Sequence, residues 1–288
     1  MRTYLDCIPC LTRQTLEAAR MVSDDEVFHQ RLLAEILQAL STIDMSLPPP
    51  AMARLIHGRI RELSGNPDPY REIKQRFNRM AWELLPALKK KVVASTSPLE
   101  MAVRAAIAGN VIDFGAKAAL REEDVQAAME QCLTVPLAGD FGRFAQRIHA
   151  SRQILYLADN AGEIVFDRLL LEQLAPRRVT VAVKGGPIIN DALLADAEEA
   201  RIGELAEVID NGSGAPGTIL DDCSPRFRRR FDEAELIIAK GQANYETLSD
   251  VPRPIFFLLQ VKCPMIARNL GQPLGRLLLA ASRQIMGE

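Results

Sequence analysis

The second half of the chain repeats short, almost wholly apolar runs, and this repetition narrows the possible folds more than any other feature. Five such runs occur, at residues 154–158, 179–183, 207–209, 236–239 and 255–259, and helical patterns alternate with them. Near-continuous apolar strands alternating with helices are typical of a parallel sheet whose two faces are both covered. The pattern therefore predicts an α/β domain built on such a sheet.

Polar residues follow four of the expected strands at the point where each strand ends. Asp159 and Asn160 follow the first strand, Lys184 the second, a glycine-rich segment at 210–217 the third, and Lys240 the fourth. Because ligand sites in a parallel sheet lie outside the carboxyl ends of the strands, we expect these residues to line one cleft. The backbone N–H groups of the 210–217 segment are candidates for binding an anion there.

The first third of the chain has a different, mainly helical pattern. Segments such as Leu11–Val22 and Ile73–Leu85 space apolar residues three and four apart, with charged residues between them. Residues 95–100 combine serines, a proline and a glutamate in the order expected of a linker that begins a helix. We therefore predict a helical N-terminal domain at residues 1–98 and an α/β domain at residues 99–288.

Composition excludes several classes of partner. The chain has 288 residues, of which 48% are hydrophobic, and a formal net charge of -2, so it offers no basic field for nucleic acid or anionic lipid. No stretch approaches the roughly 18 apolar residues of a membrane span, and the first residues lack the apolar segment of a signal peptide. The 5 cysteines are an odd count, which argues against a complete disulfide framework. We expect a cytoplasmic protein that binds neither nucleic acid nor membrane.

Asp159, Asn160 and Asp191 are the candidate metal ligands. Asp159 and Asn160 follow one expected strand, and Asp191 lies in the loop after the next. Carboxylate and amide oxygens are hard ligands that suit Mg²⁺ or Mn²⁺, with water and substrate phosphate filling the other positions. The same residues also suit a purely structural role, with Asp159 and Glu163 capping one helix and Asp191 in the first turn of another.

Lys240 is the candidate phosphate ligand. It ends an expected central strand, and Gly241 after it would let the backbone approach a ligand closely. Asn244 and Glu246 lie about one helical turn further on. The alternative is a lysine exposed to solvent at the edge of the sheet, which fits poorly with a buried strand.

Asn110 and Asp113 lie three residues apart in an otherwise apolar helical segment, so they share one helix face. If buried, both side chains need hydrogen-bond partners. They either anchor the core or face the active-site cleft, and the sequence leaves both interpretations open.

Cys7 and Cys10 form a CxxC motif near the N-terminus. The other three cysteines form no second CxxC, as a structural zinc site would normally require. A redox motif of the thioredoxin type would instead open a helix after a strand. A disulfide, a metal site completed by a distant cysteine, and a pair of core thiols all remain open, and we expect no catalytic role. No HExxH, GxSxG or phosphate-binding GxxxxGK[ST] motif occurs.

Taken in order, these motifs resemble the DUF89 or ARMT1-like damage-control phosphatase family. The CxxC motif makes the chain most similar to the stand-alone microbial branch. The likeness spans nearly the whole chain and rests on CIPC at the N-terminus, GNPDPY at 65–70, GNVIDFG at 109–115, LADNAGEIVFD at 157–167, VKGGPIINDA at 183–192, DNGSGAPGT at 210–218, AKGQANYETL at 239–248 and VKCP at 261–264.

This resemblance implies a helical N-terminal domain packed on a Rossmann-like α/β/α domain, and a metal-dependent phosphatase that acts on small phosphorylated metabolites. Sugar phosphates and phosphorylated cofactor fragments are both in keeping with the family, as are Mn, Mg, Co or Ni as the divalent ion. The metal ligands of the family match Asp159, Asn160 and Asp191, and its KGxxN segment matches Lys240 and Asn244, with Glu246 nearby. We predict catalytic roles for Asp159 and Lys240, the latter because a lysine suits phosphate. The predicted substrate-binding residues in the cleft are Asn110, Asp113, Glu163, Asn244 and Glu246.

The sequence leaves two other functions open. The fold class alone also permits an S-adenosylmethionine-dependent methyltransferase or another nucleotide-binding enzyme, although the loop after the first strand has one glycine where a dinucleotide fingerprint needs three. A non-catalytic metal or thiol protein centred on Cys7 and Cys10 is the second alternative. Within the phosphatase hypothesis, the nucleophile is either a metal-bound water or a carboxylate such as Asp159.

Overall fold

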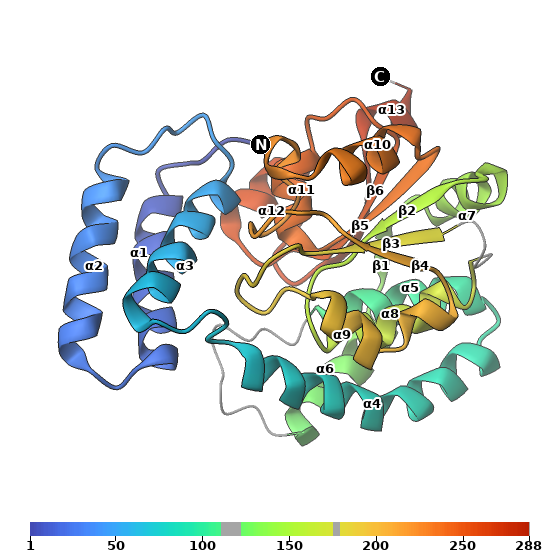
Figure 1. Ribbon diagram of the computed structural model, residues 1–288. Helices are drawn as coiled ribbons and strands as arrows, with labels where there is room; N and C mark the ends of the chain where they lie inside the picture. Colours follow the sequence, from blue (N-terminus) through green and yellow to red (C-terminus); the bar gives the residue numbers. More distant parts are fainter. Residues whose placement is uncertain (111–121, 175–178, 288) are drawn as a thin grey trace.

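The computed structural model describes residues 1–110, 122–174 and 179–287. Figure 1 shows the N-terminal helices set beside a larger part in which helices surround a sheet. The expected α/β class with an additional helical part at the N-terminus is confirmed. No helix in these described ranges is long and apolar enough to cross a membrane.

The three N-terminal helices are α1 (Cys7–Val22), α2 (Glu26–Leu40) and α3 (Pro49–Ser64). Local sequence sets their ends: the Asp25 side chain accepts a hydrogen bond from the first turn of α2, and α3 begins on a proline and ends at Gly65 in the left-handed conformation. Leucines and isoleucines of all three helices form a hydrophobic cluster of their own. This group is therefore held together by its own core.

The next two helices, α4 (Arg71–Ala94) and α5 (Pro98–Gly109), belong to the layers of the larger part. Phe77 and Leu84 of α4 share a hydrophobic cluster with strand residues such as Tyr156, and α4 packs on helices further along the chain. The domain boundary expected after residue 98 stays a prediction, but by its core the separate helical unit ends at α3.

Within the part of the chain that the structure describes, seven strands form one sheet. They are β1 (Leu137–Gly139), β2 (Ile154–Leu157), β3 (Val179–Val183), β4 (Glu207–Asp210), β5 (Leu236–Lys240), β6 (Ile255–Gln260) and β7 (Leu277–Ala281). Their order is β1-β7-β6-β5-β2-β3-β4. All neighbouring pairs are parallel except β6 and β7, so β1 and β7 run opposite to the other five.

Helices cover both faces of this sheet, which gives three layers. One face carries α4, α5, α6 (Glu122–Thr134), α7 (Phe141–Ala150), α8 (Glu163–Leu171), α9 (Leu194–Glu199) and the short α13 (Arg283–Met286). The other carries α10 (Pro225–Glu233), α11 (Gly241–Leu248) and α12 (Pro264–Leu270). Alternate strand residues face the two sides: Tyr156 packs in the first cluster and Leu155 in the second.

The order of the strands determines where a ligand site is expected. From β2 the chain moves outward to β3 and β4, then returns to β5 on the other side of β2. The loops after β2 and β5 therefore leave the sheet on opposite sides of the point where the order reverses. In open α/β sheets this switch point is where ligands bind, and the polar strand ends predicted from the sequence meet there.

Candidate functional site

The loop after β2 carries the first two candidate ligands, Asp159 and Asn160, and leads directly into α8. Gly162 makes this tight connection with a positive φ of 75°, and its N–H donates to Asn78 Oδ1 at 2.6 Å. Asn78 lies on α4 and is fully buried, so the helix layer fixes the turn from behind. A residue with a Cβ would be strained at this φ, which explains the glycine.

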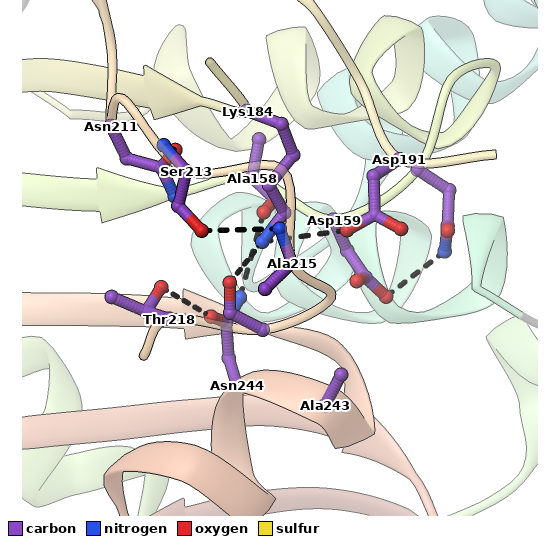
Figure 2. Close-up of polar contacts among 12 residues, drawn as sticks. Ala158, Asp159, Lys184, Asp191, Asn211, Ser213, Ala215, Thr218, Ala243 and Asn244 are labelled. Atoms are coloured by element: carbon purple, nitrogen blue, oxygen red, sulfur yellow. Dashed lines mark hydrogen bonds and ion pairs between the residues drawn. The ribbon is translucent and has the colours of Figure 1, made fainter. Parts of the chain in front are cut away.

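Backbone contacts bring the third candidate ligand, Asp191, next to the first two. Asn160 and Asp191 form an isolated antiparallel bridge, and Ala192 N–H donates to the Asp159 carbonyl at 2.8 Å. Figure 2 shows the side chains of Asp159 and Asp191 converging beside Lys184. The structure thus gathers the three ligand candidates predicted from the sequence at one point.

The two carboxyl groups are buried beside a third, that of Glu163. Burial and then the charges of Glu163 and Asp191 hold the pKa of Asp159 well above its ordinary value. Burial also raises the pKa of Asp191 to about 6, although the nearby Lys184 charge lowers it. Buried like charges destabilise one another unless a cation compensates them. The site therefore has an excess of negative charge that a cation would relieve.

Asn110 and Asn160 hold the carboxylates together. Asn110 Nδ2 donates to Asp159 Oδ2 at 2.5 Å and to Glu163 Oε2 at 2.8 Å. Asn160 Nδ2 donates to the same two oxygens at 2.9 Å and 2.8 Å. Each amide thus bridges the predicted ligand Asp159 and the predicted cleft residue Glu163. Asp113, predicted to share a face with Asn110, lies outside the described residues.

Gly241 lets the main chain pass directly over Asp159. Its φ is 79°, and a Cβ built on it would lie 1.9 Å from Asp159 Oδ2. No other residue type fits at this distance, because the added carbon would overlap the carboxylate. The glycine predicted to allow a close backbone approach therefore does so, toward the candidate metal ligand itself.

Lys240 does not face the cleft, and its expected role as a phosphate ligand is revised. Its side chain is fully buried, and Nζ donates to Ala106 O at 2.9 Å, to Glu163 Oε1 at 2.7 Å and to Asp167 Oδ1. An ammonium has three donors, so none remains for a phosphate. The reason is that α8 places Glu163 and Asp167 over the central strand, where they bind the lysine.

Lys184, at the end of β3, is the lysine that faces the acid pair. It is buried, its Nζ lies 3.4 Å from Asp191 Oδ1, and it also donates to the Gly217 carbonyl. Its local sequence pattern is the same as that of Lys240, a lysine followed by glycine after a buried strand. The sequence pattern predicts Lys184 in the cleft, but the phosphate-binding role was assigned to Lys240.

Asn244 and the 210–217 loop are tied to the protein rather than open to a ligand. Asn244 Nδ2 donates to Lys240 O at 2.8 Å and its Oδ1 accepts from the Thr218 hydroxyl at 2.7 Å. Within the loop, the N–H groups of Ser213 and Ala215 donate to loop side chains. The expected anion nest is therefore largely occupied by the loop itself, and Asn244 clamps the loop to the end of β5.

Glu246 lies on α11, one helical turn after Gln242, and is separate from the group formed by Asp159, Glu163 and Asp191. It accepts a hydrogen bond from Gln242 Nε2 at 2.9 Å, and burial raises the pKa of its carboxyl to about 7. It lines a cavity together with Cys7, Cys10 and Cys263. Its predicted contact with substrate stays a prediction, and the structure gives it a defined surface for that contact.

The chemistry of the donor set suits a hard divalent ion. Among the described residues, no group of three or more Cys, His, Asp or Glu side chains is arranged to hold a metal by itself. Two carboxylates and one amide, with water and phosphate in the remaining positions, are the usual provision for Mg²⁺. Asp191 Oδ1 is buried and makes no hydrogen bond to the described residues, as expected of an oxygen with a ligand still to bind.

Comparison with known proteins decides the family. Residues 3–278 match the family model described as the damage-control phosphatase ARMT1-like domain. The chain belongs to this family. Its membership confirms the relationship predicted from the eight motifs, and it supports phosphatase activity for the chain.

This ARMT1-like chain aligns with its relatives over nearly the full length of both proteins. It is 39% identical over 276 residues to a damage-control phosphatase of Archaeoglobus fulgidus, covering 93% of this chain and 95% of the relative. It is 35% identical over 284 residues to the damage-control phosphatase PH1575 of Pyrococcus horikoshii, covering 96% and 97%. The crystal structure of that Pyrococcus horikoshii protein, described as a DUF89 family protein, superimposes with a TM-score of 0.89 at 33% identity, covering 98% of this chain and 99% of the other.

Proposed function

We propose that the protein hydrolyses phosphomonoesters of small metabolites with a divalent metal ion bound by Asp159, Asn160 and Asp191, and that it serves metabolite damage control. The observation that carries this proposal is the buried acid pair at the sheet's switch point, where Asp191 Oδ1 forms an ion pair with Lys184 but no hydrogen bond to the described residues. Such an acid pair is costly to the apo protein and useful only with a cation. The names of the relatives support phosphatase chemistry in preference to methyl transfer or a thiol-centred function.

The residues of the chain have distinct roles in this reaction. The bound ion would supply electrostatic stabilisation to a phosphoryl group as its P–O bond breaks. Asn110 orients Asp159 through the hydrogen bond to Oδ2, and Glu163 receives the second N–H of the same amide. Lys184 places its positive charge beside Asp191, where a phosphoryl oxygen would also benefit from it.

Lys240 affects the site indirectly, because it contacts Glu163 and Asp167 and not the predicted metal ligands. It forms ion pairs with Glu163 and Asp167 inside the core and so holds Glu163 where its other oxygen accepts from both asparagine amides. It is a positioning residue rather than a group that touches substrate. Stereochemistry would identify the nucleophile: inversion at phosphorus indicates direct attack by water, and retention indicates a carboxylate such as Asp159.

The test is a phosphatase screen of the purified protein with Mg²⁺, Mn²⁺, Co²⁺ and Ni²⁺ against sugar phosphates and phosphorylated cofactor fragments. Asp159→Asn and Asp191→Ala should each lower activity by at least about 100-fold. Calorimetric Mn²⁺ binding should weaken in parallel, while far-ultraviolet circular dichroism stays unchanged. Asp232→Asn, on the exposed side of α10, is the matched control. Full activity in either site variant would contradict the metal assignment.

A further inference from the structure

A cavity of about 660 Å³ lies between the N-terminal helices and the site. Cys7 and Cys10 of α1 and Ala53 of α3 line it on one side, and Glu246 of α11 and Cys263 at the start of α12 on the other. Pockets of about 300–1,000 Å³ hold drug-sized ligands in proteins. The cavity is therefore large enough for an organic group of considerable size.

The walls of this cavity continue into the backbone of the candidate site. Ile189 lies two residues before the ligand Asp191, and Ala243 lies two residues after Gly241, which covers the Asp159 carboxylate. Pro216 precedes the carbonyl that binds Lys184. Figure 2 shows Ala243 on the same side of the acid pair as Asn244. A molecule with its phosphate at the acid pair would have the cavity next to it.

Ile189 adds independent support for a ligand at this wall. Its φ is 42°, a left-handed conformation that β-branched residues rarely adopt. Such strain costs about 1–3 kcal/mol and is found mainly at active sites and ligand clamps. Arg61 of α3 donates to the Pro187 carbonyl at 2.6 Å, so the helical unit holds the strained loop in place from the other side of the cavity.

The lining is predominantly apolar. Besides the three thiols it includes the methionine side chains of residues 1 and 265, and prolines at positions 9, 49, 50, 216 and 264. The charged groups among the lining residues are those of Asp6, Arg13 and Glu246 and the N-terminal ammonium of Met1, which donates to the Glu246 carbonyl at 2.7 Å. Gln242 donates to Glu246, and its buried Oε1 makes no hydrogen bond to the described residues, so one acceptor is available to a ligand's donor.

We propose that this cavity binds the alcohol portion of the substrate, and that the preferred substrates are phosphomonoesters of extended, mainly apolar alcohols with one or two hydrogen-bond donors. The inference rests on the proposed phosphatase function and narrows it. A sugar carries a hydroxyl on nearly every carbon, and most of these would lose water in the cavity without gaining a partner. An apolar chain loses nothing polar and fills the same volume.

A series of n-alkyl phosphates from ethyl to octyl tests the proposal in the Mn²⁺-loaded protein. The ratio kcat/KM should rise about fourfold per added methylene, the equivalent of ~0.8 kcal/mol for each buried methylene. Octyl phosphate should also exceed hexose phosphates. Hydrolysis with no dependence on chain length would overturn this inference alone, whereas failure to hydrolyse any phosphomonoester would overturn the proposed function.

Two alanines of α3 provide a matched pair of variants. Ala53 lines the cavity and Ala51 does not, although both are partly buried on the same helix. Ala53→Phe should lower the ratio of octyl to ethyl phosphate hydrolysis by at least tenfold, because the ring occupies the space of several methylenes. Ala51→Phe should leave that ratio unchanged. Equal ratios in the two variants would overturn the assignment of the cavity.

The lining thiols give a readout that needs no turnover. Octylphosphonate with Mn²⁺ should slow alkylation of Cys10 by iodoacetamide several-fold, measured by mass spectrometry, whereas methylphosphonate should not. Cys132 and Cys223 serve as internal controls, because both are buried away from the cavity. An unchanged rate of Cys10 alkylation with octylphosphonate would show that the chain does not occupy the cavity.

Discussion

Replacing Lys240 with methionine would decide whether this lysine binds phosphate or balances charge inside the core. Methionine has a similar length and no charge, so the substitution removes the cation and leaves the volume filled. Glu163 and Asp167 are then fully buried with no positive partner. A phosphate-binding lysine would instead leave the stability of the fold unchanged when removed.

The expected loss of stability is large. Breaking a buried ion pair by removing one partner costs about 3–5 kcal/mol, because the remaining charge stays in the core. With a denaturation slope of ~2 kcal/mol per molar urea, the midpoint should fall by about 1.5–2.5 M at pH 7. Lys90→Met, at an exposed position on α4, should change stability by less than about 0.5 kcal/mol.

The loss should depend on pH. Burial raises the pKa of Asp167 to about 6, although Lys240 pulls it down. At pH 5 this carboxyl is mostly protonated in the folded protein, so less negative charge is left behind when the lysine is removed. The difference between Lys240→Met and the parent protein should therefore shrink by about 1 kcal/mol or more between pH 7 and pH 5.

Urea denaturation followed by circular dichroism at both pH values measures these differences. Adding Asp167→Asn to Lys240→Met should restore part of the lost stability, since one of the two unpaired charges is then gone. If Lys240→Met is as stable as the parent at pH 7, the assignment of Lys240 as a charge-balancing residue is refuted.

Three further substitutions have expected outcomes. Burial and the charge of Arg61 lower the pKa of His57 to about 3, so below pH 6.5 this histidine binds a proton in the unfolded chain but not in the folded one. Lowering the pH from 7.5 to 5.5 should therefore reduce the free energy of unfolding by about 1.4 kcal/mol through His57. His57→Gln should remove this contribution, measured by urea denaturation of both proteins at the two pH values. Gly241→Ala should displace Asp159 and reduce phosphatase activity by about 100-fold, measured on the best substrate of the screen. Gly58→Ala, where an added Cβ meets nothing within 4 Å, should keep full activity and raise stability by about 0.5–1 kcal/mol.

The meeting of Asp159 and Asp191 was predictable because it depends on local rules. Two apolar strands joined by a helix pair in parallel, and the residues that follow them leave the same edge of the sheet. β2 and β3 do pair in this way, in register from Ile154 with Val179. Nothing beyond the order of strand, loop and helix was needed to bring the two carboxylates together.

The choice between Lys184 and Lys240 was not predictable from these rules. Both follow buried strands and precede a glycine, so their local sequence signals are the same. Their roles differ because α8 packs Glu163 and Asp167 against β5, where they accept two of the three Lys240 donors and the Ala106 carbonyl accepts the third. That contact depends on the order of strands in the sheet, which the sequence pattern does not specify.

The strands β1 and β7 were also not predicted from the sequence. β1 has 3 residues, too few to show a period, and the Leu-Leu-Leu-Ala-Ala run of β7 is equally compatible with a buried helix. β7 becomes a strand because β6 and β1 offer it hydrogen-bonding edges on both sides. Neither strand contributes a residue to the candidate site, so the prediction of the site residues did not depend on them.

The separate core of α1–α3 has a consequence for how such enzymes diversify. The candidate ligands lie on loops of the sheet, whereas one wall of the cavity belongs to a helical unit whose apolar cluster contains no residue of the sheet. Apart from Arg61, which binds the Pro187 carbonyl, changes in that unit can therefore accumulate without disturbing the loops that carry the carboxylates. A lineage that retains the sheet and alters only these three helices would acquire new substrates with the same reaction, which makes the helical unit the place to engineer selectivity.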